Sequence, residues 1–159
     1  MDYLWTPWRF SYITGGERAD GCIFCRQLEQ NEDERNYIVH RGGGNYIVLN
    51  IYPYTVGHLL IVPYRHIAGL AEGTRDELGE MMELTQRAEA ALRKIYRPQG
   101  LNVGMNLGSA AGAGVAGHLH MHVLPRWEAD ANFISVVGET RVLPEELPVT
   151  WRKLKAELG

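Results

Sequence analysis

The chain has 159 residues, 45% of them hydrophobic, which suits one domain with an ordinary core. Its formal net charge of −3 gives no overall basic surface for a nucleic acid polymer, although a small anionic substrate could bind at a local site. No apolar run approaches the ~18–20 residues of a membrane-spanning helix, and the segment Met1–Trp5 lacks the features of a signal peptide, so we expect a cytoplasmic protein without a membrane partner.

Residues 1–21 are expected to form an N-terminal arm, because the segment LWTPWRFSYI is rich in aromatic side chains and is interrupted by Pro7. The arm would pack across the body of the protein or across a partner subunit. Simple core packing explains the aromatic side chains equally well, so both interpretations stay open.

Two cysteines follow, Cys22 and Cys25, in a CxxC arrangement. Their spacing does not indicate a disulfide framework. Three interpretations remain: a redox pair, part of a zinc site that needs two more ligands, or two small buried side chains. A redox pair would be expected between a strand and a helix, and the polar loop before Cys22 weakens that interpretation.

Strand-like segments occupy the next part of the chain. Residues 26–35 are polar and suit a short helix. Residues 37–40 and 46–50, which flank a glycine-rich turn, predict a β-hairpin. Residues 58–63 predict a third strand, which Pro63 would end.

One long helix is expected over residues 74–96, because apolar side chains recur at helical spacing and Pro98-Gln99-Gly100 then stops the pattern. The stripe is expected to face the core, and it consists of Leu78, Met81, Met82, Thr85, Ala88, Leu92 and Ile95.

A fourth strand is expected over residues 101–106, followed by a loop over residues 108–117 that contains four glycines. Without bulky polar side chains, the backbone amides of this loop stay accessible and can surround phosphate oxygens. A flexible connector is the alternative, but the position of the loop directly before a row of histidines favours phosphate binding. The candidate contacts are Ser109, Gly112 and Gly114.

The row is the segment HLHMHVLP, residues 118–125, in which histidine and apolar residues alternate. This period of two predicts a half-buried strand with the imidazoles of His118, His120 and His122 on one face and apolar side chains on the other. Metal binding and phosphate chemistry are the two specific interpretations. Neighbouring histidines on one face of a strand rarely converge on one small ion, so phosphate chemistry fits better.

Beyond the row, residues 126–134 lead into a further extended piece, and a terminal helix is expected near residues 149–158.

The segment HLHMHVLP, together with the upstream block NIYPYTVGHLLIVP, resembles the two signatures of the histidine triad (HIT) family. The resemblance covers roughly residues 22–127. The segments LWTPWR and RW…DANFI make the chain most similar to the bacterial diadenosine-tetraphosphate phosphorylase-like members, within the broader fragile-histidine-triad branch.

This resemblance implies an α+β fold, in which a five-stranded antiparallel sheet packs against one long helix and a C-terminal helix follows. It also implies a homodimer in which two sheets lie side by side. The whole chain, residues 1–159, would then be a single HIT domain, with residues 1–21 as an arm and residues 128–159 as a C-terminal extension.

The family chemistry implied is nucleotidyl transfer from an α-phosphate of a dinucleoside polyphosphate, with adenine as the implied base. His120 matches the nucleophile, and water or phosphate would release the nucleotide from it. His122 would bind phosphoryl oxygens or the leaving group, His118 would orient its neighbours, and His58 would lie near the phosphates. Two further residues match nucleotide contacts: Asn50 matches a ribose-binding residue, and Asn106 replaces a phosphate-binding glutamine with a shorter side chain.

Some HIT relatives, including galactose-1-phosphate uridylyltransferases, hold a structural zinc with a CxxC, a histidine after the third strand and the first histidine of the triad. The matching residues here are Cys22, Cys25, His66 and His118, and two sulfurs with two nitrogens suit zinc. No organic cofactor is expected. The uridylyltransferases carry glutamine in place of the third histidine, so His122 argues against that activity.

Two alternatives to cleavage of dinucleoside polyphosphates remain open. One is a nucleoside phosphoramidase, the activity of the compact HIT branch, against which the RW…DANFI segment argues. The other is a nucleotide- and zinc-binding sensor without turnover.

Overall fold

The computed structural model describes residues 21–128, 130–131 and 143–159, so the arm expected over residues 1–21 lies almost wholly outside the described residues, as does much of the extended piece after residue 131. Five strands form one antiparallel sheet in the order β1-β2-β3-β5-β4. The strands are β1 (Ile38–Arg41), β2 (Asn45–Leu49), β3 (Leu59–Pro63), β4 (Gly100–Gly104) and β5 (Met121–Arg126). The helices are α2 (Ile23–Gln30), η1 (Leu70–Glu72), α3 (Arg75–Tyr96), η2 (Ser109–Ala111) and α5 (Leu147–Leu158).

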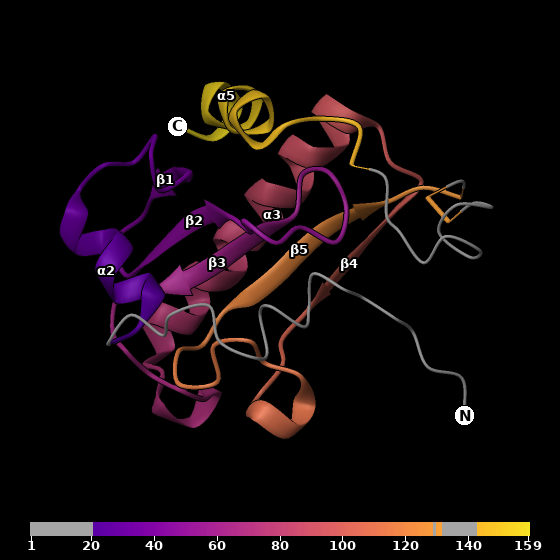
Figure 1. The fold of residues 1–159 in the computed structure, drawn as a ribbon. Coiled ribbons are helices and arrows are strands. Elements are labelled where there is room, and N and C mark those ends of the chain that lie inside the picture. Colours follow the sequence, from indigo (N-terminus) through magenta and orange to yellow (C-terminus); the bar gives the residue numbers. More distant parts are fainter. Residues whose placement is uncertain (1–20, 129, 132–142) are drawn as a thin grey trace.

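The long helix α3 packs along one face of the sheet, and α5 lies beside it near β1 (Figure 1). The main hydrophobic core lies between α3 and this face. A second, smaller cluster covers the opposite face, where Phe24 of α2 packs against Ile38, Tyr46 and Val62. Because both faces of β2 and β3 are covered, these strands are apolar and buried along most of their length. The expected α+β fold is confirmed.

The ends of α3 agree with its sequence signals. Thr74 caps the N-terminus in a reciprocal capping box with Glu77, and Arg97 ends the helix in a left-handed conformation. The expected core stripe needs one correction, because Met82 is 51% exposed while Leu84 and Ala91 are buried. At 3.6 residues per turn, Met82 is rotated by about 100° from the buried Met81, which places it at the edge of the apolar face.

Strand β5 begins three residues later than the histidine alternation predicts. His118 and His120 precede the strand, and the Leu119 amide donates to the Ile67 carbonyl rather than to the sheet. The pairing of β3 with β5 stops at Ile61 and Met121, and Pro63, two residues further on, has no N–H with which to extend it.

The shorter elements shift by a few residues from the sequence prediction. Helix α2 begins at the CxxC instead of at residue 26, with Cys22 as its N-cap, and it ends at a left-handed Asn31. Helix α5 begins two residues early, where Pro148 occupies the first turn. Among the described helices, none is long and apolar enough to cross a membrane.

Candidate active site and metal centre

The predicted two-faced character of the histidine segment is present in the structure. Leu119, Met121 and Val123 enter the main core beneath α3. The histidines lie on the other side: the imidazoles of His118 and His120 contact Phe24, and His122 contacts His58. The ring centroids of His120 and His122 are 5.0 Å apart.

The protonation state of His120 follows from its partner. Its Nδ1 lies 2.8 Å from the backbone carbonyl oxygen of His118, which can only accept a hydrogen bond. Nδ1 therefore carries the proton. Burial lowers the pKa of His120, so the ring is neutral at neutral pH and its Nε2 keeps a lone pair. His120 is thus suited to act as a nucleophile through Nε2.

His122 has the opposite tautomer, which a relay through His58 determines. The backbone N–H of Tyr54 donates to His58 Nδ1 at 3.2 Å, so the proton of the neutral His58 ring lies on Nε2. His58 Nε2 then donates to His122 Nδ1 at 2.9 Å. The proton of His122 consequently lies on Nε2, which has no hydrogen-bond partner within the described residues. A buried N–H donor without a partner is suited to an incoming phosphoryl oxygen.

Electrostatics keep His122 neutral. Burial, followed by the neighbouring His120, lowers the pKa of His122 to about 4. The Nε2 lone pair of His120 and the Nε2–H group of His122 therefore belong to two uncharged imidazoles with complementary tautomers.

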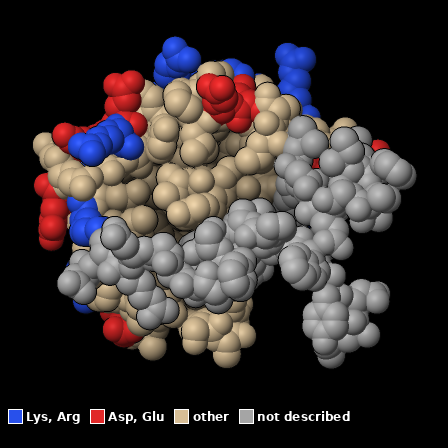
Figure 2. Space-filling model, viewed as in Figure 1, with Lys and Arg blue, Asp and Glu red and all other residues tan. Residues whose placement is uncertain are grey.

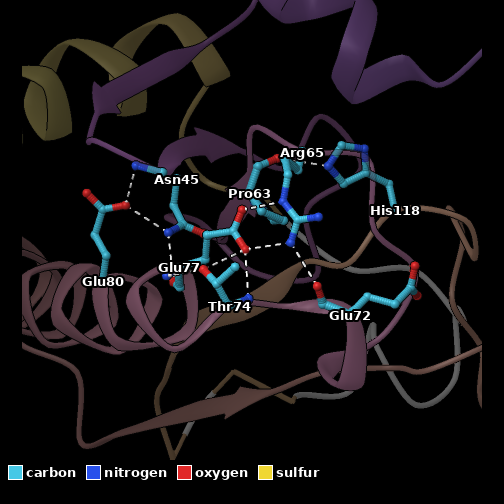
Figure 3. A network of polar contacts seen from close by, with 9 residues as sticks. Asn45, Pro63, Arg65, Glu72, Thr74, Glu77, Glu80 and His118 are labelled. Atoms are coloured by element: carbon cyan, nitrogen blue, oxygen red, sulfur yellow. Dashed lines mark hydrogen bonds and ion pairs between the residues drawn. The ribbon is translucent and has the colours of Figure 1, made fainter.

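His118 belongs to a different site from its two neighbours. Its side chain is 1% exposed, and its Nε2 donates to the Pro63 carbonyl at 2.9 Å, as the dashed line in Figure 3 shows. Its Nδ1 lies 3.3 Å from Cys22 Sγ and 3.6 Å from Cys25 Sγ. Both nitrogens of the His118 ring therefore face protein atoms, and the side chain belongs with the two cysteines. It is the backbone carbonyl of His118 that orients His120.

The four residues expected to bind zinc converge. Cys25 Sγ also lies 3.4 Å from His66 Nδ1, and the four ligand atoms all lie within 4.8 Å of one another. With Zn–S of about 2.3 Å and Zn–N of about 2.0–2.1 Å, sulfur and nitrogen in a tetrahedral zinc site lie about 3.6 Å apart. Burial and the adjacent Cys22 raise the pKa of the Cys25 thiol, so two thiolates at this place need a cation between them. The residues therefore fit zinc.

An ion pair holds the segment that carries His66. Arg65 forms two hydrogen bonds with the carboxylate of Glu77 and a third with the Glu72 carbonyl (Figure 3). Arg65, followed by the Thr74 amide, lowers the pKa of Glu77 to about 2, so the pair stays charged at neutral pH. This connection between β3 and α3 fixes the chain next to His66.

Asn50 and Asn106 differ in how they are placed. The Asn50 side chain accepts from the Tyr52 amide at 2.9 Å, and its Nδ2 lies 3.3 Å from His58 Nδ1, so it orders the turn before β3. Asn106 follows the end of β4 and forms no side-chain hydrogen bond among the described residues. Its amide is therefore available for a ligand.

The glycine-rich loop uses some of its own amides. The N–H groups of residues 111, 112 and 113 donate to carbonyls within the loop. Those of residues 108–110 and 114–117 take part in no backbone hydrogen bond within the described part of the chain. Val115 packs beside the cluster that contains Phe24, and Gly117 lies close to His66, so the second half of the loop passes the site.

Two residues near the histidines were not predicted as functional. Tyr54 provides the amide that sets the relay, and its ring lies 4.7 Å from that of His58. Phe24 contacts the rings of both His118 and His120. Both residues lie inside the motifs that the sequence highlights, but nothing in their spacing indicates these contacts.

Comparison with known proteins gives a consistent family. The HIT domain family matches residues 31–129. The chain is 42% identical to AP-4-A phosphorylase of Mycobacterium tuberculosis over 164 residues, which cover 99% of this chain and 84% of that protein. It superposes with a TM-score of 0.70 and 27% identity on a Zn-bound histidine triad family protein from Mycobacterium smegmatis, covering 86% of this chain and 92% of the other. A HIT family member from Bacillus subtilis gives a TM-score of 0.63 at 27% identity, covering 88% and 99%. The chain therefore belongs to the HIT domain family.

Proposed function

We propose that the protein is a HIT-family enzyme that cleaves dinucleoside polyphosphates such as diadenosine tetraphosphate at an α-phosphate. The observation that carries this proposal is the pair of complementary tautomers, in which His120 presents a lone pair at Nε2 and His122 presents an N–H at Nε2. The similarity to a protein named AP-4-A phosphorylase supports the same class of substrate.

In the proposed reaction, His120 Nε2 attacks the α-phosphorus and forms a P–N bond while the bond from phosphorus to the bridging oxygen breaks. The leaving group departs as a nucleoside polyphosphate. His122 Nε2–H donates to a phosphoryl or leaving-group oxygen, and this interaction strengthens as negative charge grows there. Water or inorganic phosphate then attacks phosphorus and releases the nucleotide, which restores the His120 lone pair.

The surface charge agrees with binding by neutral donors. On the face seen in Figure 2, basic and acidic side chains are intermixed around the margin, and no broad basic area is visible there. Because the formal net charge of −3 also gives no overall basic surface, the polyphosphate would depend on local N–H groups: His122 Nε2, the Asn106 amide and the free amides of the loop. Asn50 would act mainly by ordering the turn before β3.

The proposal is tested by incubating the protein with diadenosine tetraphosphate, with and without inorganic phosphate. Products AMP and ATP indicate hydrolysis, whereas ADP and ATP indicate phosphorolysis. A protein that binds the nucleotide without turnover would be a sensor. Faster cleavage of an adenosine phosphoramidate than of diadenosine tetraphosphate would favour the phosphoramidase.

His120→Ala is expected to abolish turnover and the covalent nucleotidyl-enzyme, because no other described side chain offers a free imidazole lone pair at that point. His40→Ala is the matched control, since His40 lies on β1 beside Arg87, outside the row. Residual activity of the His120 variant above about one part in a hundred would exclude this nucleophile.

We also propose that Cys22, Cys25, His66 and His118 hold one structural zinc per chain. When bound, zinc supplies a cross-link between α2, the β3–α3 connection and the start of the histidine segment. Elemental analysis of protein prepared without chelator is expected to give about one zinc per chain. Cys22→Ser should lower this content. Metal-free wild-type protein would contradict the site.

We further propose a homodimer that pairs through β4. Strand β4 is the outer strand on its side of the sheet, and its last three residues, 102–104, are exposed. An uncovered edge strand is a surface for pairing with a second copy.

A further inference from the structure

Phe24 lies between the two cysteines in the sequence and between two histidines in space. Its side chain is 6% exposed. Its ring centroid lies 5.4 Å from that of His118, at an interplanar angle of 75°, and 5.3 Å from that of His120, at 52°. These are tilted and edge-on arrangements of the kind that aromatic rings prefer.

The His120 imidazole needs a constraint beyond its one hydrogen bond. The covalent bond at Cγ and the hydrogen bond from Nδ1 to the His118 carbonyl hold two neighbouring ring atoms, which leaves rocking about the line that joins them. Phe24 and His122 are the two aromatic groups that contact the His120 ring within the described residues. These two contacts limit the rotation of the His120 ring and thereby set the direction of its Nε2 lone pair.

Phe24 is itself held firmly. Its carbonyl accepts a hydrogen bond from the Tyr46 hydroxyl at 3.4 Å, and its ring packs among side chains of β1, β2 and β3. The cysteines on either side of it, Cys22 and Cys25, lie within 3.6 Å of His118 Nδ1. The ring is thus a fixed surface against which the His120 imidazole packs.

We propose that Phe24 is a positioning residue for nucleotidyl transfer, and that its ring holds the His120 imidazole with Nε2 directed at the α-phosphorus. This inference rests on the proposed function, in which His120 is the nucleophile. Attack at phosphorus requires alignment, and a displacement of about 1 Å can lower the rate of a reaction by about 10²-fold. Phe24 acts through His120, so its loss should affect the chemical step more than substrate binding.

The experiment compares Phe24→Ala and Phe24→Met with Leu28→Ala, measuring kcat, KM, the thermal midpoint and metal content for each. Leu28 is the matched control because it lies on the same helix and packs against the same cluster without a ring contact to a histidine. Phe24→Ala is expected to lower kcat by about tenfold or more, with KM within about threefold of wild type. Phe24→Met, which refills most of the space, should recover most of the loss, and Leu28→Ala should keep kcat near wild type.

Several results would overturn the proposal. A rise in KM with unchanged kcat would assign Phe24 to substrate binding, and an equal loss of kcat in Leu28→Ala would indicate general destabilisation. A loss that follows metal content rather than the ring would also exclude a direct role. If Phe24→Ala does not fold, Phe24→Val replaces it, and because valine leaves more of the space empty it should still lose kcat relative to Phe24→Met. Activity in His120→Ala defeats the proposed function, whereas an inactive His120→Ala with normal Phe24 variants defeats the positioning role alone.

Discussion

At the scale of single residues, the chemistry of the site depends on which nitrogen of each imidazole carries a proton. Backbone groups decide this in two places: the His118 carbonyl fixes His120, and the Tyr54 amide fixes His58. His58 then fixes His122. Such groups cannot change their donor or acceptor role, so the tautomers are set before substrate arrives.

The relay predicts how activity depends on pH. Protonated His122 would carry an N–H at Nδ1, which would oppose the N–H of His58 across a 2.9 Å contact. The pKa of His122 lies at about 4, below the ordinary value, and burial also lowers the pKa of His120. A lowered pKa keeps both rings neutral as the pH falls. The acid limb of kcat/KM, which reports the free enzyme, should therefore have its midpoint below the ordinary histidine pKa of about 6.5.

The measurement is kcat/KM for diadenosine tetraphosphate between about pH 4.5 and about pH 8.5, which spans about two pH units on either side of 6.5. The internal phosphates of this substrate stay ionised over that range, so the limb belongs to the enzyme. A midpoint at or above about 6.5 would show that the histidines titrate as if exposed.

At the scale of elements, the sequence predicts the strands and α3 well because each has a strong local pattern. The errors arise where contacts between distant parts of the chain determine where an element begins or which side chains are buried. The histidine alternation continues through His118, but Pro63 on the neighbouring strand prevents the ladder from reaching it. Met82 is apolar like a core residue, yet its angular position on α3 leaves its side chain exposed.

The site shows the same division between local and distant information. The residues of the candidate metal site and of the histidine row belong to recognisable motifs, so they could be named from the sequence. The tautomer of His122 depends on His58, which lies 64 positions away. The contact between Phe24 and His120 depends on how α2 packs against the sheet. Neither is readable from spacing.

Substitutions at two glycines of the loop over residues 108–117 are expected to test different properties. Gly112 has φ of 91°, and its N–H donates to Ser109, so a valine there strains the backbone whether or not the loop binds phosphate. Gly114 is the better position at which to test phosphate binding, because its N–H donates to no backbone carbonyl within the loop. Gly114→Val should lower kcat/KM by about tenfold, with more of the loss in kcat than in KM.

Ala111→Val is the control for this prediction, since the amide of Ala111 already donates to the Gly108 carbonyl. Steady-state kinetics on both variants give the comparison. If Gly114→Val stays within about threefold of wild type, the loop is a connector and phosphate binds elsewhere.

At the scale of the whole molecule, the two edge strands of the sheet, β1 and β4, differ in how they are covered. At the β1 edge, α5 covers the strand: the Trp151 indole N–H donates to the Ile38 carbonyl at 3.0 Å, and Lys155 donates to the Val39 carbonyl at 3.1 Å. These side chains satisfy backbone groups that could otherwise pair with another chain. No described element covers β4 in the same way.

An exposed apolar side chain on β4 leads to a prediction about assembly. Val103 lies opposite Val123, so its side chain is on the α3 side of the sheet, yet it is 47% exposed. In a dimer that joins two β4 strands, the side chains near the axis would be buried, and a carboxylate there would meet its own copy. Val103→Glu is therefore expected to convert the proposed dimer to a monomer, because two like charges would be desolvated together.

Light scattering coupled to size-exclusion chromatography measures the mass of each variant. Met82→Glu is the matched control, since Met82 is an equally exposed apolar residue on α3, away from the sheet edge, and its substitution should leave the dimer intact. If wild type is already monomeric, or if Met82→Glu dissociates the dimer while Val103→Glu does not, the β4 edge is not the interface. Dissociation by Val103→Glu alone would identify the uncovered edge of the sheet as the surface that joins the two subunits.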